Sequence, residues 1–182
     1  MVVNKDSWMR TFTGLQFDFL NIKACQIHIL DIAHSLANLC RFTGHIKEFY
    51  SVAEHSLIVS HLVPEEFALA GLLHDASEAY LADINKPAKS LLPQYYELEK
   101  KVQAAIAKRY DFKHGADEVQ YADNTALIAE AKHLLEEKDF SGWGEIEYDE
   151  TFVYKSIPLT PRQAEQKFTL RFLKLSGRKL LD

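Results

Sequence analysis

Residues 71–78 read Gly71-Leu72-Leu73-His74-Asp75-Ala76-Ser77-Glu78, which sets an imidazole and a carboxylate side by side in an otherwise apolar run. Pro64 suits the first position of a helix, and the apolar residues after it keep helical spacing as far as Tyr80. We therefore expect this stretch to be helical and buried. A buried carboxylate without a partner costs several kcal/mol, roughly, so it should have a counter-charge such as a cation. Imidazole nitrogen and carboxylate oxygen together are ligands for a divalent transition metal.

Two further candidate ligands lie on other predicted helices. His55 falls in the first turn of a helix that begins after Ser51, the first residue of a capping box completed by Glu54. Asp123 lies in a long predicted helix over 117–138. With the central His-Asp pair they form a metal tetrad, drawn from three predicted helices: His55, His74, Asp75 and Asp123.

Glu78 follows His74 by four residues and would share its helix face, close to water bound at such a metal. The spacing of these residues also fits an ordinary protein core without a metal site. In that interpretation His74 is hydrogen-bonded in the core, Asp75 pairs with a basic side chain, and Asp123 is solvated. Spacing alone leaves both interpretations open.

The rest of the chain has the apolar spacing of further helices. Predicted helices cover residues 25–40, 51–62, 64–80, 94–110, 117–138 and 161–176, with a polar break over 83–89. Residues 1–23 are expected to form an irregular arm or short hairpin packed on the body. Residues 139–158 look like a long loop, with a short strand pair as an option. Since no repeat, low-complexity tract or linker divides residues 1–182, we expect one all-α domain.

The composition restricts the class of protein. A formal net charge of −5 argues against a general nucleic-acid surface, so no nucleic acid polymer is expected as a partner. The apolar stretches are too short to cross a bilayer, and no membrane contact is expected. Cys25 and Cys40 do not form a Cys-x-x-Cys pair, and no signal peptide is evident. These features favour a cytoplasmic protein with reduced thiols.

The tetrad resembles the H…HD…D signature of the HD-domain metal-dependent phosphohydrolases. The resemblance extends from about Ile32 to Leu127, and residues 51–56 and 74–78 are its most specific blocks. It is similar in particular to the small nucleotidase branch, which includes bacterial 5′-deoxynucleotidases and phage dATP triphosphohydrolases. The resemblance implies an all-α HD-domain helical bundle with one divalent transition metal per subunit (Zn, Co, Mn or Fe). It also implies a homo-oligomer, a dimer or a hexamer.

The resemblance assigns a role to each matching residue. The metal ligands would be His55, His74, Asp75 and Asp123. Glu78 matches the catalytic acid that orients water or transfers a proton. Four residues match substrate-binding positions: Asp83 at the sugar 3′-hydroxyl, Arg41 and Lys89 at the phosphate, and Phe42 near the base, where relatives carry tryptophan.

We therefore expect a phosphohydrolase that cleaves the 5′-phosphate ester of deoxynucleotides, with dATP or dAMP as the first expectation. The products would be a nucleoside and either phosphate or triphosphate. A divalent ion lowers the pKa of bound water, while guanidinium and ammonium groups bind the remaining phosphate oxygens. Two alternatives stay open. One is an HD phosphodiesterase or pyrophosphohydrolase acting on a cyclic dinucleotide or guanosine alarmone, and the other is a non-catalytic nucleotide-binding HD scaffold.

Overall fold

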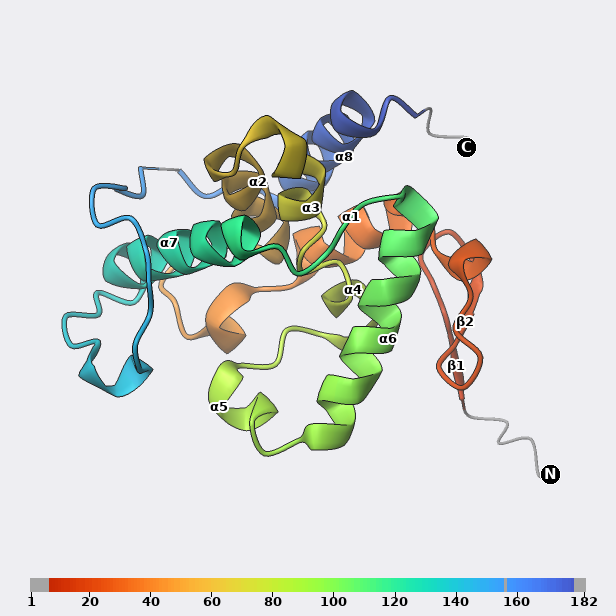
Figure 1. Cartoon of the computed structure of the whole chain (residues 1–182), viewed down its shortest axis with the longest axis horizontal. Helices are drawn as coiled ribbons and strands as arrows, with labels where there is room; N and C mark the ends of the chain where they lie inside the picture. The colour runs from red at the N-terminus through yellow and green to blue at the C-terminus, as the bar shows by residue number, and fades with distance from the viewer. Residues whose placement is uncertain (1–6, 156, 179–182) are drawn as a thin grey trace.

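The computed structural model describes residues 7–155 and 157–178. Within these residues the chain forms eight α-helices and one two-stranded sheet (Figure 1). The helices are α1 (Ile29–Asn38), α2 (Val52–Leu62), α3 (Ala68–Leu72), α4 (Glu78–Leu81), α5 (Lys86–Lys89), α6 (Pro93–Tyr110), α7 (Asp117–Leu134) and α8 (Pro161–Ser176). The expectation of an all-α fold is confirmed.

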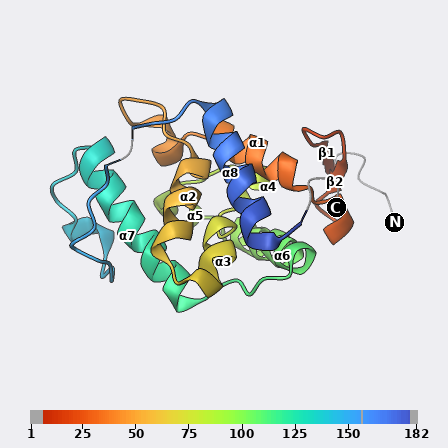
Figure 2. The ribbon, with the colours of Figure 1, turned by 90° about the horizontal axis from the view of Figure 1, so that it is seen from above.

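The N-terminal arm is a hairpin of two antiparallel strands, β1 (Trp8–Arg10) and β2 (Gln16–Asp18), in which Met9 lies opposite Phe17. Phe17 is fully buried, and its ring stacks on Tyr80 of α4 with the ring centroids 4.2 Å apart. Figure 2 shows the hairpin and α7 at opposite ends of the molecule. The predicted arm is therefore a hairpin that aromatic packing holds against the helical body.

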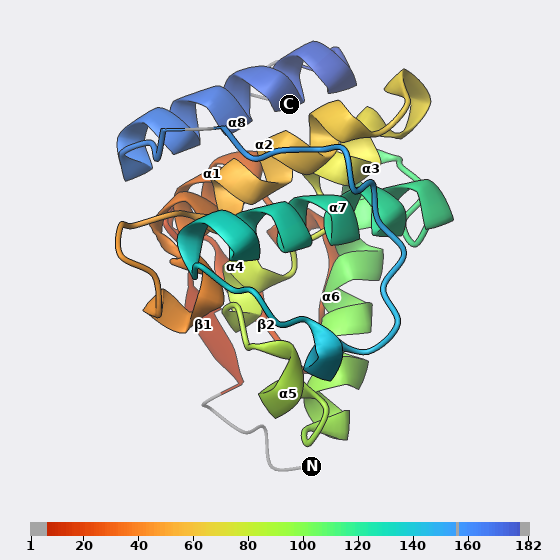
Figure 3. The same ribbon diagram turned by 90° about the vertical axis from the view of Figure 1, so that its left-hand side faces the viewer.

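The main core lies between α1, α2, α3 and α8. Helix α1 packs along α8, and α2 packs on both α3 and α8. Fully buried apolar side chains from these helices and from α6 fill this space: Ile32, Leu36, Val52, Leu72, Ile106 and Phe168. Figure 3 shows α2 between α8 and α7, and α2 also packs on α7. Helix α2 thus separates the main core from the helix that carries Asp123.

The prediction of one continuous helix over 64–80 is wrong. A 3₁₀ turn (Glu65–Phe67), helix α3, a non-helical turn over 73–77 and helix α4 take its place. Regular helix ends after Leu72, because Leu73 has φ of −106° and ψ of 12°. His74 and Asp75 therefore lie in a turn between two helices. A regular helix would turn their side chains about 100° apart.

The predicted start of α2 is confirmed. The Ser51 hydroxyl accepts a hydrogen bond from the backbone N–H of Glu54, and the Glu54 carboxylate accepts one from the backbone N–H of Ser51. The same carboxylate accepts a hydrogen bond of 2.7 Å from the backbone N–H of Leu159. The first turn of α2 is thereby anchored both locally and to the segment that leads into α8.

Other boundaries differ from the expectation in detail. Helix α1 covers only part of 25–40 and follows a 3₁₀ turn (Ala24–Gln26), while α7 ends at Leu134. The polar break over 83–89 contains α5, and the described part of 139–158 contains a 3₁₀ turn (Ser141–Trp143) and no strand. No helix within 7–155 and 157–178 combines the length and apolar character that spanning a bilayer requires.

Phe168→Ala should lower the free energy of unfolding by roughly 3–5 kcal/mol, because the ring is fully buried and its loss leaves a cavity. Urea unfolding followed by circular dichroism measures this change. Leu170 on the same helix is 66% exposed, so Leu170→Ala should change the free energy of unfolding by less than about 0.5 kcal/mol. Equal losses in the two variants would contradict the core face assigned to α8.

Candidate metal centre

The structure brings the four predicted ligand side chains together from α2, the α3–α4 turn and α7. The Nε2 atoms of His55 and His74 are 3.2 Å apart. Oδ1 of Asp123 lies 3.0 Å from His55 Nε2, and Oδ2 of Asp75 lies 3.2 Å from His74 Nε2. Ligand atoms that bind one cation at about 2.0–2.2 Å are themselves about 2.8–3.6 Å apart. His55, His74 and Asp75 each offer one ligand atom within 4.8 Å of the others, so this His-His-Asp group can hold a metal ion.

Both imidazoles turn Nε2 toward the centre because their Nδ1 atoms have other partners. Nδ1 of His55 is 2.8 Å from Oε1 of Glu130, and Nδ1 of His74 is 2.8 Å from the carbonyl oxygen of Gly71. An acceptor at Nδ1 keeps the proton on that nitrogen and leaves the Nε2 lone pair for a metal. The two rings are therefore oriented as metal ligands are.

The break between α3 and α4 explains how two adjacent residues reach one point. Outside a regular helix, the side chains of His74 and Asp75 need not diverge, and their Nε2 and Oδ2 atoms come within 3.2 Å. Glu78 was expected to share a helix face with His74, but it is instead the first residue of α4. His74 and Asp75 thus come together through a turn, and not through the helical geometry that was expected.

The charges of the centre depend on one another. Burial disfavours the imidazolium form of His74, yet Asp75 and Asp123 raise its pKa well above the ordinary value. Burial also disfavours ionised Asp75, but His74 outweighs this effect and lowers the pKa of Asp75 to about 2. Hydrogen bonds with His55 and His74 likewise hold the pKa of Asp123 well below its usual range despite burial. The two carboxylates stay ionised and need positive charge beside them, from imidazole protons or from a divalent cation.

Glu130 of α7 is a site residue that the sequence analysis missed. Its side chain is fully buried, and Oε1 accepts a hydrogen bond of 2.7 Å from the Tyr50 hydroxyl in addition to its contact with His55. Oε2 forms an ion pair with Nε of Arg41 at 3.1 Å. Burial raises the pKa of Glu130, but His55 and Arg41 lower it by more. One signal was available, because Glu130 follows Asp123 by seven residues, or two helical turns on the same face.

Arg41 lies beside the tetrad. Its Nη1 atom is 3.7 Å from Oδ2 of Asp75, and its guanidinium carbon is 5.4 Å from the centroid of the Phe42 ring. Both residues belong to a 3₁₀ turn (Arg41–Gly44) in which Phe42 and Thr43 have φ of 54°. Positive φ is costly for such residues, and strained backbone of this kind is concentrated at ligand sites. The structure thus brings Arg41 to the tetrad and Phe42 to Arg41.

Glu78 is buried at the start of α4, and its Oε2 has no hydrogen-bond partner among the described residues. Burial raises the pKa of Glu78 well above the ordinary value, and the nearby charges of Asp75 and Asp83 raise it further. Asp83 is partly buried, and burial is also the main reason that its pKa is raised. A buried carboxyl group with a raised pKa and an unpartnered oxygen is suited to hold and transfer a proton.

A cleft of about 400 Å³ opens beside the tetrad. His74, Asp75 and Asp123 line it, together with Lys89 and with residues of α6 and the start of α7. The Nζ atom of Lys89 is 2.7 Å from Oε1 of Glu99. Lys89 therefore lies at the cleft, where an ion pair with Glu99 engages its ammonium group.

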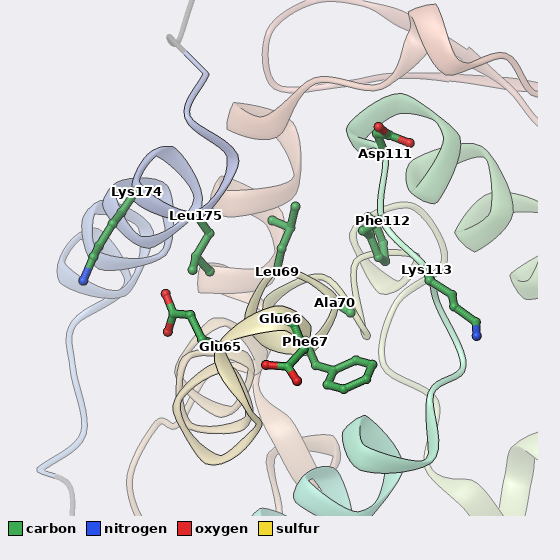
Figure 4. A pocket seen from close by; sticks show the side chains of 10 residues that line it. All are labelled: Glu65, Glu66, Phe67, Leu69, Ala70, Asp111, Phe112, Lys113, Lys174 and Leu175. Carbon is green, nitrogen blue, oxygen red and sulfur yellow. The ribbon is translucent and has the colours of Figure 1, made fainter.

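A second cavity, of about 430 Å³, is lined by residues from the turn before α3, from α3, from the segment after α6 and from α8. Its charged side chains come from separate elements, and Figure 4 shows Glu65, Asp111 and Lys174 pointing in different directions. No residue of the tetrad lines this cavity. The cleft beside the tetrad is therefore the candidate functional site.

Glu130→Gln should weaken the binding of a divalent metal about 10- to 100-fold, because an amide is a weaker acceptor for the His55 ring and removes the counter-charge of Arg41. Isothermal titration with Mn²⁺ or Zn²⁺ measures the dissociation constant. Glu118→Gln, in the exposed first turn of the same helix, is the matched control and should bind as the parent does. Parent-like affinity in Glu130→Gln would remove this role.

Comparison with known proteins identifies related chains. No family model matches this chain. It is 43% identical to the uncharacterized protein YfdR of Escherichia coli over 173 residues, which cover 93% of this chain and 96% of that protein. It is 35% identical to an uncharacterized protein of Rhodobacter capsulatus over 161 residues, covering 81% of this chain and 80% of that protein.

A 5′-deoxynucleotidase of Pasteurella multocida is more distant, with 25% identity over 123 residues that cover 65% of this chain and 56% of that enzyme. The first two likenesses extend over most of each sequence. On that basis this chain belongs to the protein family of Escherichia coli YfdR.

Proposed function

We propose that this chain is a metal-dependent phosphohydrolase that cleaves the 5′-phosphate ester of deoxynucleotides, with dATP or dAMP as first candidates. The products would be a nucleoside and phosphate, or triphosphate when the substrate is a dNTP. The observation that carries the proposal is the convergence of two imidazole Nε2 atoms and two carboxylates beside a buried arginine. The distant likeness to a 5′-deoxynucleotidase supports the same class of reaction. In this proposal the chain forms one HD-type domain and assembles as a homo-oligomer.

The proposed metal ligands are His55, His74, Asp75 and Asp123. Two neutral nitrogens and two carboxylate oxygens suit a divalent transition metal such as Zn, Co, Mn or Fe, and the two negative charges match its charge. When bound, the metal would lower the pKa of a water molecule and offset the charge of the phosphoryl group.

Glu78 is the proposed proton donor. In the hydrolysis a water molecule would lose a proton to solvent as its oxygen joins phosphorus. The bond between phosphorus and O5′ would break, and O5′ would take the proton of the Glu78 carboxyl and leave as a hydroxyl. The raised pKa keeps the Glu78 carboxyl protonated to higher pH than an ordinary glutamate, and its Oε2 atom has no competing hydrogen bond among the described residues. These properties support a role as general acid.

Four residues are proposed to bind the substrate. Arg41 would bind a phosphate oxygen from its position beside Asp75. Lys89 would leave its ion pair with Glu99 and bind the phosphate as a second positive group. Phe42 would contact the base, and the partly buried Asp83 would accept a hydrogen bond from the sugar 3′-hydroxyl.

Purified protein that has been stripped with a chelator and reloaded with Mn²⁺, Co²⁺ or Zn²⁺ should release nucleoside from deoxynucleotides faster than from ribonucleotides. A panel of the four dNTPs, the four dNMPs and their ribose counterparts, with products separated by chromatography, measures this. A cyclic dinucleotide and a guanosine alarmone belong in the same panel. Turnover of these two alone would favour the other type of HD enzyme, and nucleotide binding without any turnover would favour a non-catalytic scaffold.

Glu78→Gln should lower kcat by about 100- to 10,000-fold while sparing metal affinity, because the isosteric amide cannot supply the proton. In the parent, kcat should fall as pH rises through the raised pKa of Glu78, because the protonated carboxyl is lost there. In the variant, kcat should not show this fall. Steady-state kinetics across pH measure both effects. Glu97→Gln, at an exposed position of α6, is the control. A parent-like kcat in Glu78→Gln would exclude the assigned role.

A further inference from the structure

The break between α3 and α4 leaves two backbone groups that a continuous helix would join. In a regular helix the N–H of residue 77 donates to the carbonyl of residue 73. Here the side-chain amide of Gln103, from α6, bonds to both groups instead. Its Nε2 donates to the carbonyl of Leu73 at 2.7 Å, and its Oε1 accepts from the backbone N–H of Ser77 at 3.2 Å.

The residues between these two anchored groups include His74 and Asp75. The Gln103 amide therefore bridges the Leu73 carbonyl and the Ser77 N–H, and the Leu73 carbonyl also accepts a hydrogen bond of 3.2 Å from the backbone N–H of Ala76. Glutamine suits this place because one end of its amide donates and the other accepts, and both ends are used. Gln103 is partly buried, and its neighbours Val102 and Ile106 are fully buried, so α6 holds the amide against the turn.

We propose that Gln103 is a positioning residue that sets the His74-Asp75 turn for metal binding, an inference that rests on the metal centre of the proposed function. His74 is steadied at its ring by the carbonyl of Gly71, and Gln103 steadies the backbone on both sides of the ligand pair. Without the amide, the turn can close toward a regular helix. The side chains of His74 and Asp75 would then move apart from their present separation of 3.2 Å between Nε2 and Oδ2.

The test compares metal binding with stability. Gln103→Met keeps the length of the side chain but removes both hydrogen bonds. Gln103→Glu keeps the acceptor toward Ser77 and loses the donor toward Leu73. Gln94→Met, at an exposed position of the same helix, is the matched control. Each variant is measured by titration with Mn²⁺ and Zn²⁺ at fixed pH and by urea unfolding of chelator-treated protein.

Gln103→Met should lose about 10- to 100-fold in affinity for the metal, and Gln103→Glu a smaller but clear part of that, as for other groups that orient metal ligands. The urea midpoint of the chelator-treated protein should change little, and Gln94→Met should match the parent in both measurements. Parent-like metal affinity in Gln103→Met would overturn the proposal. The proposal would also be overturned if both Gln103 variants unfold, or if each variant lowers the urea midpoint in proportion to the metal affinity that it loses. The amide would then only stabilise the fold.

Failure of this inference and failure of the proposed function give different results. A parent protein that binds metal but hydrolyses no nucleotide would remove the proposed function and leave the role of Gln103 intact. Normal hydrolysis by the parent together with parent-like metal affinity in Gln103→Met would leave the proposed function intact and remove the role of Gln103. A parent that binds neither metal would overturn both.

Discussion

The Glu130 carboxylate has no exposure to solvent. It accepts a hydrogen bond from the Tyr50 hydroxyl, contacts the His55 ring and forms an ion pair with Arg41. A buried charge without partners would cost several kcal/mol, roughly, so these contacts are strongly constrained. The same carboxylate thereby orients a proposed metal ligand, His55, and a proposed phosphate-binding residue, Arg41. A single side chain thus positions the proposed metal centre and the proposed phosphate-binding group relative to one another.

The helices that carry the centre are anchored close to it. Helix α7 supplies both Asp123 and Glu130 on one face, and α2, which packs on that helix, presents His55 in its first turn. The capping box of Ser51 and Glu54 sets where α2 begins, and the bond from Glu54 to the backbone of Leu159 ties this start to another part of the chain. Short, anchored helix starts give side chains well-defined positions, which metal binding requires.

The α3–α4 turn brings the side chains of two adjacent residues, both proposed metal ligands, to one point. Backbone groups that leave the regular helical pattern must still satisfy their hydrogen bonds, and here side chains take part. Gln103 bonds to Leu73 and Ser77, and the His74 ring bonds to Gly71. The hairpin supports α4 from outside through the stacking of Phe17 on Tyr80.

Much of the fold could be predicted from local patterns. The apolar spacing and capping residues of α2, α6 and α7 are properties of neighbouring residues, and they predicted these helices with small errors at the ends. The four residues of the tetrad could be named from the sequence because they resemble the H…HD…D signature, whereas their spacing alone also fitted an ordinary core. That they meet His55 and Asp123 within hydrogen-bond distances is the outcome of the packing of α2 on α7 and α3.

The amino-acid sequence by itself determined the helical class and the helices that carry His55 and Asp123, since these depend on short-range spacing. Only the tertiary structure decided that the helix breaks at residues 73–77, that Glu130 lies behind His55, and that Lys89 pairs with Glu99. These features depend on contacts between residues far apart in sequence, such as Gln103 with Leu73 and Glu130 with His55. Local propensity favours a continuous helix through His74 and Asp75, and a side chain from α6 bonds to the backbone on both sides of the break.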